Sequence, residues 1–120
     1  MRAVGEHLWG QVDNQVQRAT SGLSGGVGGT HEELCGALSG GVLIIGALHG
    51  RVLADDDDSY CQDLSARYRE RFVQKFGTTR CADLRESTYG SDKKWPCSVL
   101  VERATHVLLE VLRDEEGSSR

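Results

Sequence analysis

Apolar side chains recur every three or four residues in four stretches of the chain, a period typical of amphipathic α-helices. The first stretch predicts a helix over residues 3–21 and the second a helix over 30–48. The third predicts a helix that follows the acidic run at 55–58 and ends before Gly77. The last begins near Pro96, since proline is well tolerated in the first helical turn. No stretch alternates with a period of two, so the pattern predicts no strand.

The segments between these helices are short. Thr30 and Glu33 fit a capping box that would start the second helix. TTRCADL (78–84) predicts a short helical turn capped by a threonine, and STYGSDKK (87–94) predicts a loop. The sequence therefore predicts an all-α, single-domain bundle over 1–120, with about four helices plus a short helical turn and a frayed tail at 113–120.

Glycine is concentrated in two places. SGLSGGVGG (21–29) contains Gly25, Gly26, Gly28 and Gly29 and predicts a tight backbone corner rather than a linker. The next segment carries glycine at 36, 40, 41, 46 and 50 within an apolar run. Each glycine inside a helix costs about 0.8–1 kcal/mol relative to alanine. We therefore expect positions 36, 40, 41 and 46 to allow close approach of a neighbouring helix or an inorganic centre.

Charge and composition exclude several classes of protein. The formal net charge is −4 and the basic residues form no stripe, which argues against a nucleic-acid partner. The uncharged run at 34–48 is shorter than the roughly 20 residues of a membrane-spanning helix, so we do not expect an integral membrane protein. The N-terminus lacks the long apolar region of a signal peptide, which favours a cytoplasmic location.

Four cysteines are the main candidate chemistry: Cys35, Cys61, Cys81 and Cys97. All four fall near predicted helix starts, where the helix dipole favours the thiolate, so we expect lowered pKa values. Thiolates there would suit a metal or iron–sulfur centre. The spacing contains no CxxC pair, however, and position alone leaves three readings open, with inert packing ahead of metal or cluster binding and of disulfide or thiol redox chemistry.

Specific runs then resemble a known family. Residues 35–40 read CGALSG, which is similar to the CGAxxG signature of the C-GCAxxG-C-C family of redox-active proteins. RFVQKFGTTRCADL and WPCSVLVERATHVLLEVL resemble the family's later cysteine segments and place Cys81 and Cys97. The resemblance spans about residues 15–112. Typical members carry a further cysteine upstream of the glycine tract, which this chain lacks, so we hypothesise that Cys61 supplies the fourth thiol instead.

The resemblance implies a redox function. It favours a cysteine-ligated centre, a [2Fe–2S] cluster ahead of zinc, for electron transfer or redox sensing with an unidentified redox partner. His31, in the first turn of the helix that carries Cys35, is a weaker candidate for contact with that centre. The alternatives are a metal-free thiol–disulfide protein and a helical interaction protein with structural cysteines. The sequence shows no acid/base pair that would indicate an enzyme, and it leaves a homo-oligomer open.

Overall fold

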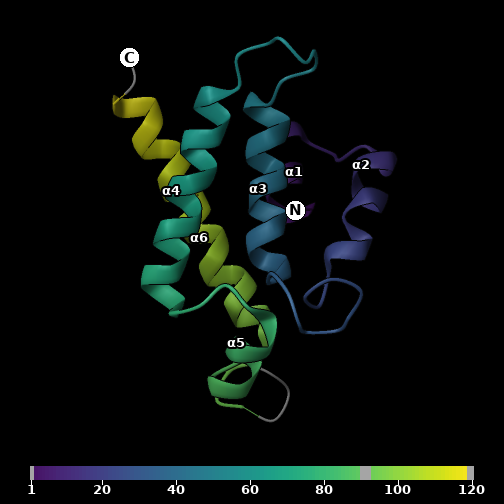
Figure 1. Cartoon of the computed structure of the whole chain (residues 1–120), viewed down its shortest axis with the longest axis vertical. Helices are drawn as coiled ribbons and strands as arrows, with labels where there is room; N and C mark the ends of the chain where they lie inside the picture. The colour runs from purple at the N-terminus through teal and green to yellow at the C-terminus, as the bar shows by residue number, and fades with distance from the viewer. Residues whose placement is uncertain (1, 90–92, 119–120) are drawn as a thin grey trace.

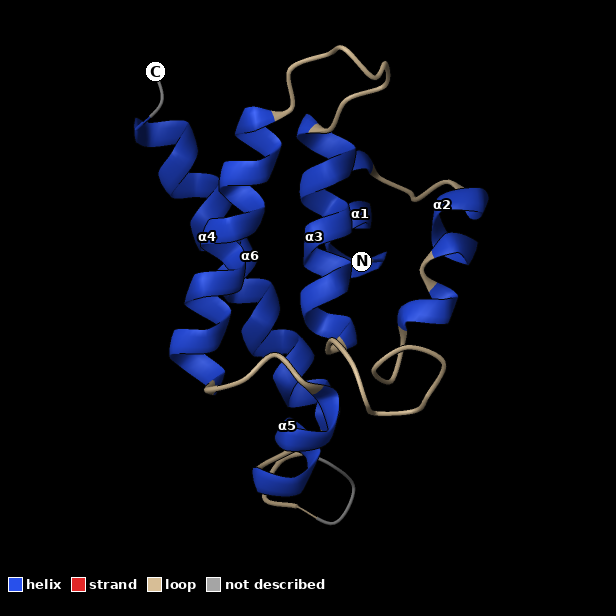
Figure 2. Cartoon of the chain, in the orientation of Figure 1, coloured by secondary structure: helices blue, strands red, loops and turns tan. Residues whose placement is uncertain are grey.

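The computed structural model describes residues 2–89 and 93–118. Within these ranges the chain forms α-helices and one short 3-10 helix but no β-strand, which confirms the all-α prediction (Figure 2). The elements are α1 (Arg2–Trp9), α2 (Asn14–Ala19), η1 (Ser21–Leu23), α3 (Gly36–His49), α4 (Ser59–Phe76), α5 (Cys81–Ser87) and α6 (Cys97–Ser118).

Helices α3, α4 and α6 pack against one another and form the core. Figure 1 shows α2 at the side of α3 and α5 at one end of the three-helix unit. The side chains of Ile44, Ile45 and Phe72 are completely buried between these helices. No helix in the described ranges combines the length and the apolar character needed to cross a membrane.

Helix α4 follows its sequence pattern closely. Leu64, Tyr68 and Phe72 are buried, as a stripe with a four-residue period predicts. Asp58 precedes the first turn, and Gly77 ends the helix with a φ of 86°, a left-handed conformation that glycine adopts without steric cost.

The prediction of one N-terminal helix over 3–21 is wrong. The helix breaks at Gly10, where φ is 84°, and starts again after Asp13. The Asp13 carboxylate accepts a hydrogen bond from the N–H of Gln15 at 2.8 Å, which is an N-cap that favours a new helix. The expected apolar face is also not buried, since Leu8 and Val16 are 39% and 41% exposed.

The start predicted for the second helix is also wrong. Helix α3 begins at Gly36 with Cys35 as its N-cap residue, not at Thr30. The Thr30 hydroxyl donates to the carbonyl oxygens of Gly26 and Val27, at 2.9 Å each, and so stabilises the preceding turn. The predicted capping box does not form, because Thr30 lies before a segment that pairs with a distant part of the chain.

The last helix begins at Cys97, directly after Pro96, as predicted. It continues through Ser118, so it extends into the segment that we expected to fray, and residues 119–120 lie outside the described ranges. The predicted loop at 87–94 lies partly outside them as well, at 90–92.

Candidate redox site

The glycine tract before α3 forms an ordered backbone corner. Residues 25–29 are five consecutive positions with positive φ, between 62° and 72°. Four of the five are glycine, which tolerates this conformation. The corner is closed by its own backbone, because the N–H of Gly28 donates to the Gly22 oxygen and that of His31 donates to the Gly25 oxygen, both at 2.8 Å.

Gly26 brings this corner against the start of α5. A Cβ atom at Gly26 would lie 2.7 Å from the Cβ of Cys81 and 2.8 Å from the Cα of His31. Both distances are shorter than any normal carbon–carbon contact. Glycine is therefore required at this position for steric as well as conformational reasons, and the requirement involves a cysteine.

A short backbone pairing sets the relation between Cys35 and Cys81. Leu34 and Arg80 form an isolated antiparallel bridge. The N–H groups of Cys35 and Cys81 each donate across it to a carbonyl of the opposite segment, at 2.8 and 2.9 Å. Residues that follow a bridging pair on either strand point to the same face of the ladder. The bridge thus holds two cysteines that are distant in sequence on one side of the pairing.

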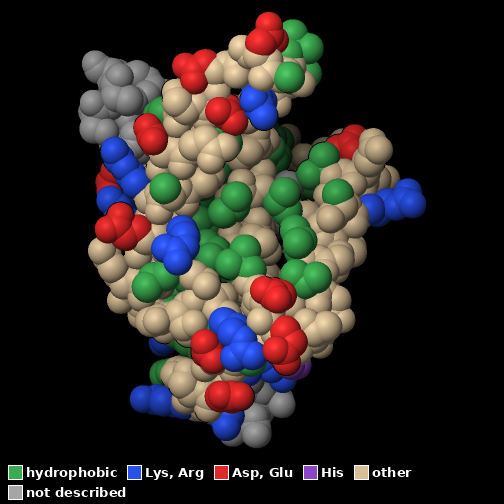
Figure 3. Space-filling model, viewed as in Figure 1, with side chains coloured by type: hydrophobic (Ala, Val, Ile, Leu, Met, Phe, Trp, Pro, Cys, Tyr) green, Lys and Arg blue, Asp and Glu red, His purple; other side chains and the backbone are tan. Residues whose placement is uncertain are grey.

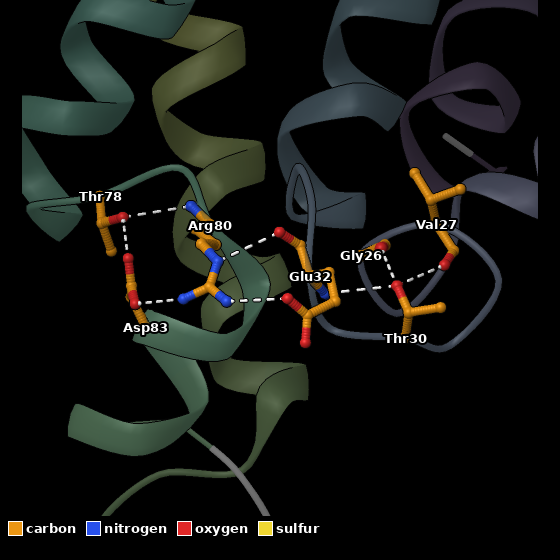
Figure 4. Close-up of polar contacts among 7 residues, drawn as sticks. All are labelled: Gly26, Val27, Thr30, Glu32, Thr78, Arg80 and Asp83. Atoms are coloured by element: carbon orange, nitrogen blue, oxygen red, sulfur yellow. Dashed lines mark hydrogen bonds and ion pairs between the residues drawn. The ribbon is translucent and has the colours of Figure 1, made fainter.

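Arg80 reinforces this pairing from the outside (Figure 4). Its guanidinium donates to the backbone oxygen and to the carboxylate of Glu32, both at 3.1 Å, and to Asp83 at 3.1 Å. The Thr78 hydroxyl in turn bonds to the other carboxylate oxygen of Asp83 and accepts from the Arg80 N–H. One side chain therefore ties the segment before α3 to the first turn of α5.

Cys97 joins the site from the start of α6. The Nη1 atom of Arg85 lies 3.7 Å from its sulfur and donates a hydrogen bond to it. Arg85 sits four residues after Cys81 on α5, which places the two side chains on the same helix face. Arg85 is consequently positioned between two of the cysteines.

Cys35, Cys81 and Cys97 line a single cavity of about 410 Å³. Its walls come mainly from α3, α5 and α6, and residues of α1 and α2 contribute on another side. Cys35 and Cys81 are 6% and 7% exposed, whereas Cys97 is half-buried. The structure thus brings three of the four cysteines to one space.

Burial, rather than the helix dipole, controls the acidity of the two most buried thiols. Burial raises the pKa of Cys35, and the N–H groups of Ala37 and Leu38 offset this only in part. Burial likewise raises the pKa of Cys81, while the nearby charge of Arg85 lowers it. Each thiolate would also repel the neighbouring cysteines. The expectation of lowered pKa values is therefore wrong for Cys35 and Cys81.

Tyr68 of α4 closes the cavity next to Cys35. Its hydroxyl donates to the backbone oxygen of Ala37 at 3.1 Å. Burial, together with the proximity of Cys35, strongly raises the pKa of the tyrosine. The phenol remains protonated at neutral pH and fixes the first turn of α3, on which Cys35 is the N-cap residue.

A comparison with protein-family models matches residues 1–111 to the family described as "Putative redox-active protein (C_GCAxxG_C_C)". The chain belongs to the C_GCAxxG_C_C family. The match confirms the resemblance seen in the sequence and extends it to the N-terminus. Searches of curated proteins and of solved structures found no match.

In this member of the C_GCAxxG_C_C family, Cys61 lies apart from the other cysteines. It borders a separate groove with Val42, Gly46 and Ala47, in the second half of α3. Gly46 is eleven residues from Cys35, or about 16 Å along the helix axis. Figure 3 shows hydrophobic side chains gathered over the middle of the viewed face, between α2, α3 and α4. The structure therefore places Cys61 in a different pocket from the other three cysteines.

The other predicted residues have distinct roles. His31 does not lie in a helical turn; it has a φ of 63° and its carbonyl accepts from the N–H of Ala82, so its backbone lies beside Cys81. Gly36 and Gly40 line the cavity. Within residues 2–89 and 93–118, no group of three or more His, Cys, Asp or Glu side chains is placed to hold a metal ion.

Sequence reasoning missed Arg80, Arg85 and the place of Tyr68 beside the cysteines. The spacing Cys81-x-x-x-Arg85 was a usable signal, because it places a cation one helical turn from a thiol. A Cβ atom at Gly41 would overlap the ring of Tyr68. The predicted crowding is thus present at Gly41, but not at Gly36, whose nearest neighbour would lie at an ordinary 3.5 Å, nor at Gly46, which faces open space.

Proposed function

We propose that this protein is a thiol-based redox protein whose active site consists of Cys35, Cys81 and Cys97. The observation that carries the proposal is the meeting of three cysteines from three helix starts in one cavity. Membership of the C_GCAxxG_C_C family supports a redox role. Thiols brought together in this way are suited to reversible disulfide formation.

Within this site, Cys35 and Cys81 are the preferred pair. Both are buried and both lie on the same face of the Leu34–Arg80 bridge. Oxidation removes two electrons and two protons from the pair and forms one sulfur–sulfur bond. Cys97, next to Arg85, is then placed to attack that disulfide as a third thiol. Such a site exchanges electrons with a partner, and we place it in the cytoplasm.

The experiment is oxidation of the reduced protein with diamide, followed by thiol counting and disulfide mapping by mass spectrometry. We expect the loss of two thiols, with a bond among Cys35, Cys81 and Cys97. The Cys61→Ser variant is the matched control and should behave as wild type, whereas Cys35→Ser should lose the Cys35–Cys81 bond. Oxidation that involves Cys61 as readily as the others would refute the proposal.

An iron–sulfur centre is the second candidate, supported by the Arg85 N–H that points at a sulfur and by the cavity that three cysteines share, although no three described His, Cys, Asp or Glu side chains are placed to hold a metal ion. The donor set does not fit a [2Fe–2S] cluster without change, since such a cluster takes four thiolates and the cavity provides three. A fourth donor from a second copy of the chain would resolve this. Metal analysis, an absorption spectrum and the oligomeric state of oxygen-free protein test this candidate.

A further inference from the structure

The cavity lined by the three cysteines has room for a small molecule beside the thiol groups. Its volume of about 410 Å³ falls within the range of small-molecule sites, roughly 300–1,000 Å³. Apolar side chains such as Val4, Ile44 and Leu108 form much of its wall. A space of this size and character suits a small apolar molecule.

One polar atom in the wall has no partner. The Oε1 atom of Gln17, on α2, is buried and accepts no hydrogen bond from any described residue. A buried acceptor without a donor costs about 1–3 kcal/mol. A bound molecule with an O–H group would supply the missing donor.

A second polar group in the wall is a donor. Arg85 lines the same cavity and carries more N–H groups than the hydrogen bond to Cys97 uses among the described residues. A carbonyl oxygen is a suitable acceptor for these N–H groups. The cavity thus offers a donor, an acceptor and reducing thiols within an apolar wall.

We propose that this cavity binds a quinone and that the Cys35–Cys81 pair reduces it. This inference rests on the proposed thiol function. The thiols lose two electrons and two protons and form a disulfide, and the quinone gains both and becomes a hydroquinone. Both forms of the ligand are neutral, so the reaction leaves no unpaired charge in the apolar cavity. The carbonyl of the quinone accepts from Arg85, and the hydroxyl of the hydroquinone donates to Gln17.

The probe is duroquinone, whose four ring methyl groups leave no free ring position for thiol addition. Reduced protein is mixed with increasing duroquinone, and hydroquinone formation, thiol loss and protein mass are followed. We expect a rate that saturates with quinone concentration, one hydroquinone for every two thiols lost, and a Cys35–Cys81 disulfide with no added mass. A rate that stays linear in quinone concentration, or a mass increase equal to the quinone, would overturn the proposal.

Gln17→Leu tests the acceptor and should weaken hydroquinone binding about five- to tenfold. Gln15→Leu, on the same helix with an exposed side chain, is the matched control and should leave binding unchanged. Equal effects of the two substitutions would refute the role of Gln17. Val101→Trp is a second variant at the half-exposed cavity wall and should also weaken binding, because the larger ring narrows the site.

The outcome separates this inference from the proposed function. If diamide forms the disulfide but duroquinone neither saturates nor oxidises the pair, the quinone site is refuted and the thiol function stands. If neither oxidant forms a disulfide among the three cysteines, both are refuted.

Discussion

The ring of Tyr68 occupies the space where a side chain at Gly41 would begin. A Cβ atom at Gly41 would lie 2.7 Å from the ring carbon that carries the hydroxyl. Helices α3 and α4 therefore approach each other more closely than two side-chain-bearing residues would allow. This contact determines the spacing of α3 and α4 beside the cavity.

We predict that Gly41→Ala lowers the free energy of unfolding by about 1–3 kcal/mol, because the added methyl group overpacks the contact with Tyr68. Gly46→Ala is the matched control on the same helix. A Cβ there meets nothing within 4 Å, so this change should stabilise the protein by about 0.8–1 kcal/mol through helix propensity. Urea denaturation measures both, and changes of the same sign would contradict the prediction.

Val27 is a β-branched residue in the left-handed region, with a φ of 70°. This conformation costs a non-glycine residue about 1–2 kcal/mol. Val27→Gly should therefore stabilise the protein by about 1 kcal/mol in thermal or urea unfolding. Val52→Gly, at a highly exposed position without positive φ, serves as the control and should give no gain.

Arg85 is expected to determine how readily Cys81 reacts. Its charge lowers the pKa of Cys81 against the opposing effect of burial. In Arg85→Gln the pKa of Cys81 should rise further, which leaves less of the reactive thiolate at pH 8. Alkylation of Cys81 by iodoacetamide at this pH should therefore slow by about three- to tenfold. Arg69→Gln, on the exposed side of α4, is the control. An unchanged rate in Arg85→Gln would exclude this electrostatic role.

Stability should decrease at alkaline pH. Folding raises the pKa values of Cys35 and Cys81 above the ordinary value of 9.0, so the unfolded chain loses these protons first as the pH rises. The contribution of these two thiols to the free energy of unfolding is complete below about pH 9. It is lost as the pH rises through their folded-state pKa values. Urea titrations between pH 8 and 10 measure this, and Tyr68, whose pKa folding also raises above the ordinary value of 10.0, adds to the decrease near pH 10.

The Cys35→Ala variant provides the control for this pH dependence. Its free energy of unfolding should vary less between pH 8 and 10 than that of the wild type. A wild-type curve that is flat over this range would contradict the assignment of raised pKa values.

The sequence predicted those parts of the fold that depend on local pattern. The buried stripe of Leu64, Tyr68 and Phe72 and the stop at Gly77 both follow from side-chain period and glycine conformation. The break at Gly10 was also readable in principle, because Asp13 is a good N-cap.

The site was less accessible to sequence reasoning because long-range contacts build it. Cys35 becomes an N-cap residue because its neighbour Leu34 pairs with Arg80, far along the chain. No local rule predicts such a pairing. The pKa values of Cys35 and Cys81 could not be predicted from local sequence either. Their position at helix starts favours the thiolate, but their burial, which raises the pKa, depends on long-range packing.

Because the bridge between Leu34 and Arg80 holds Cys35 near Cys81, the redox state of this pair would also determine whether a long loop of the chain is covalently closed. A disulfide between Cys35 and Cys81 would close a loop of about 46 residues that contains all of α3 and all of α4. Closing a loop of this length removes entropy from the unfolded chain worth about 4 kcal/mol. The oxidised protein would then unfold and be proteolysed more slowly than the reduced protein, so the thiol pair would control the stability of the core.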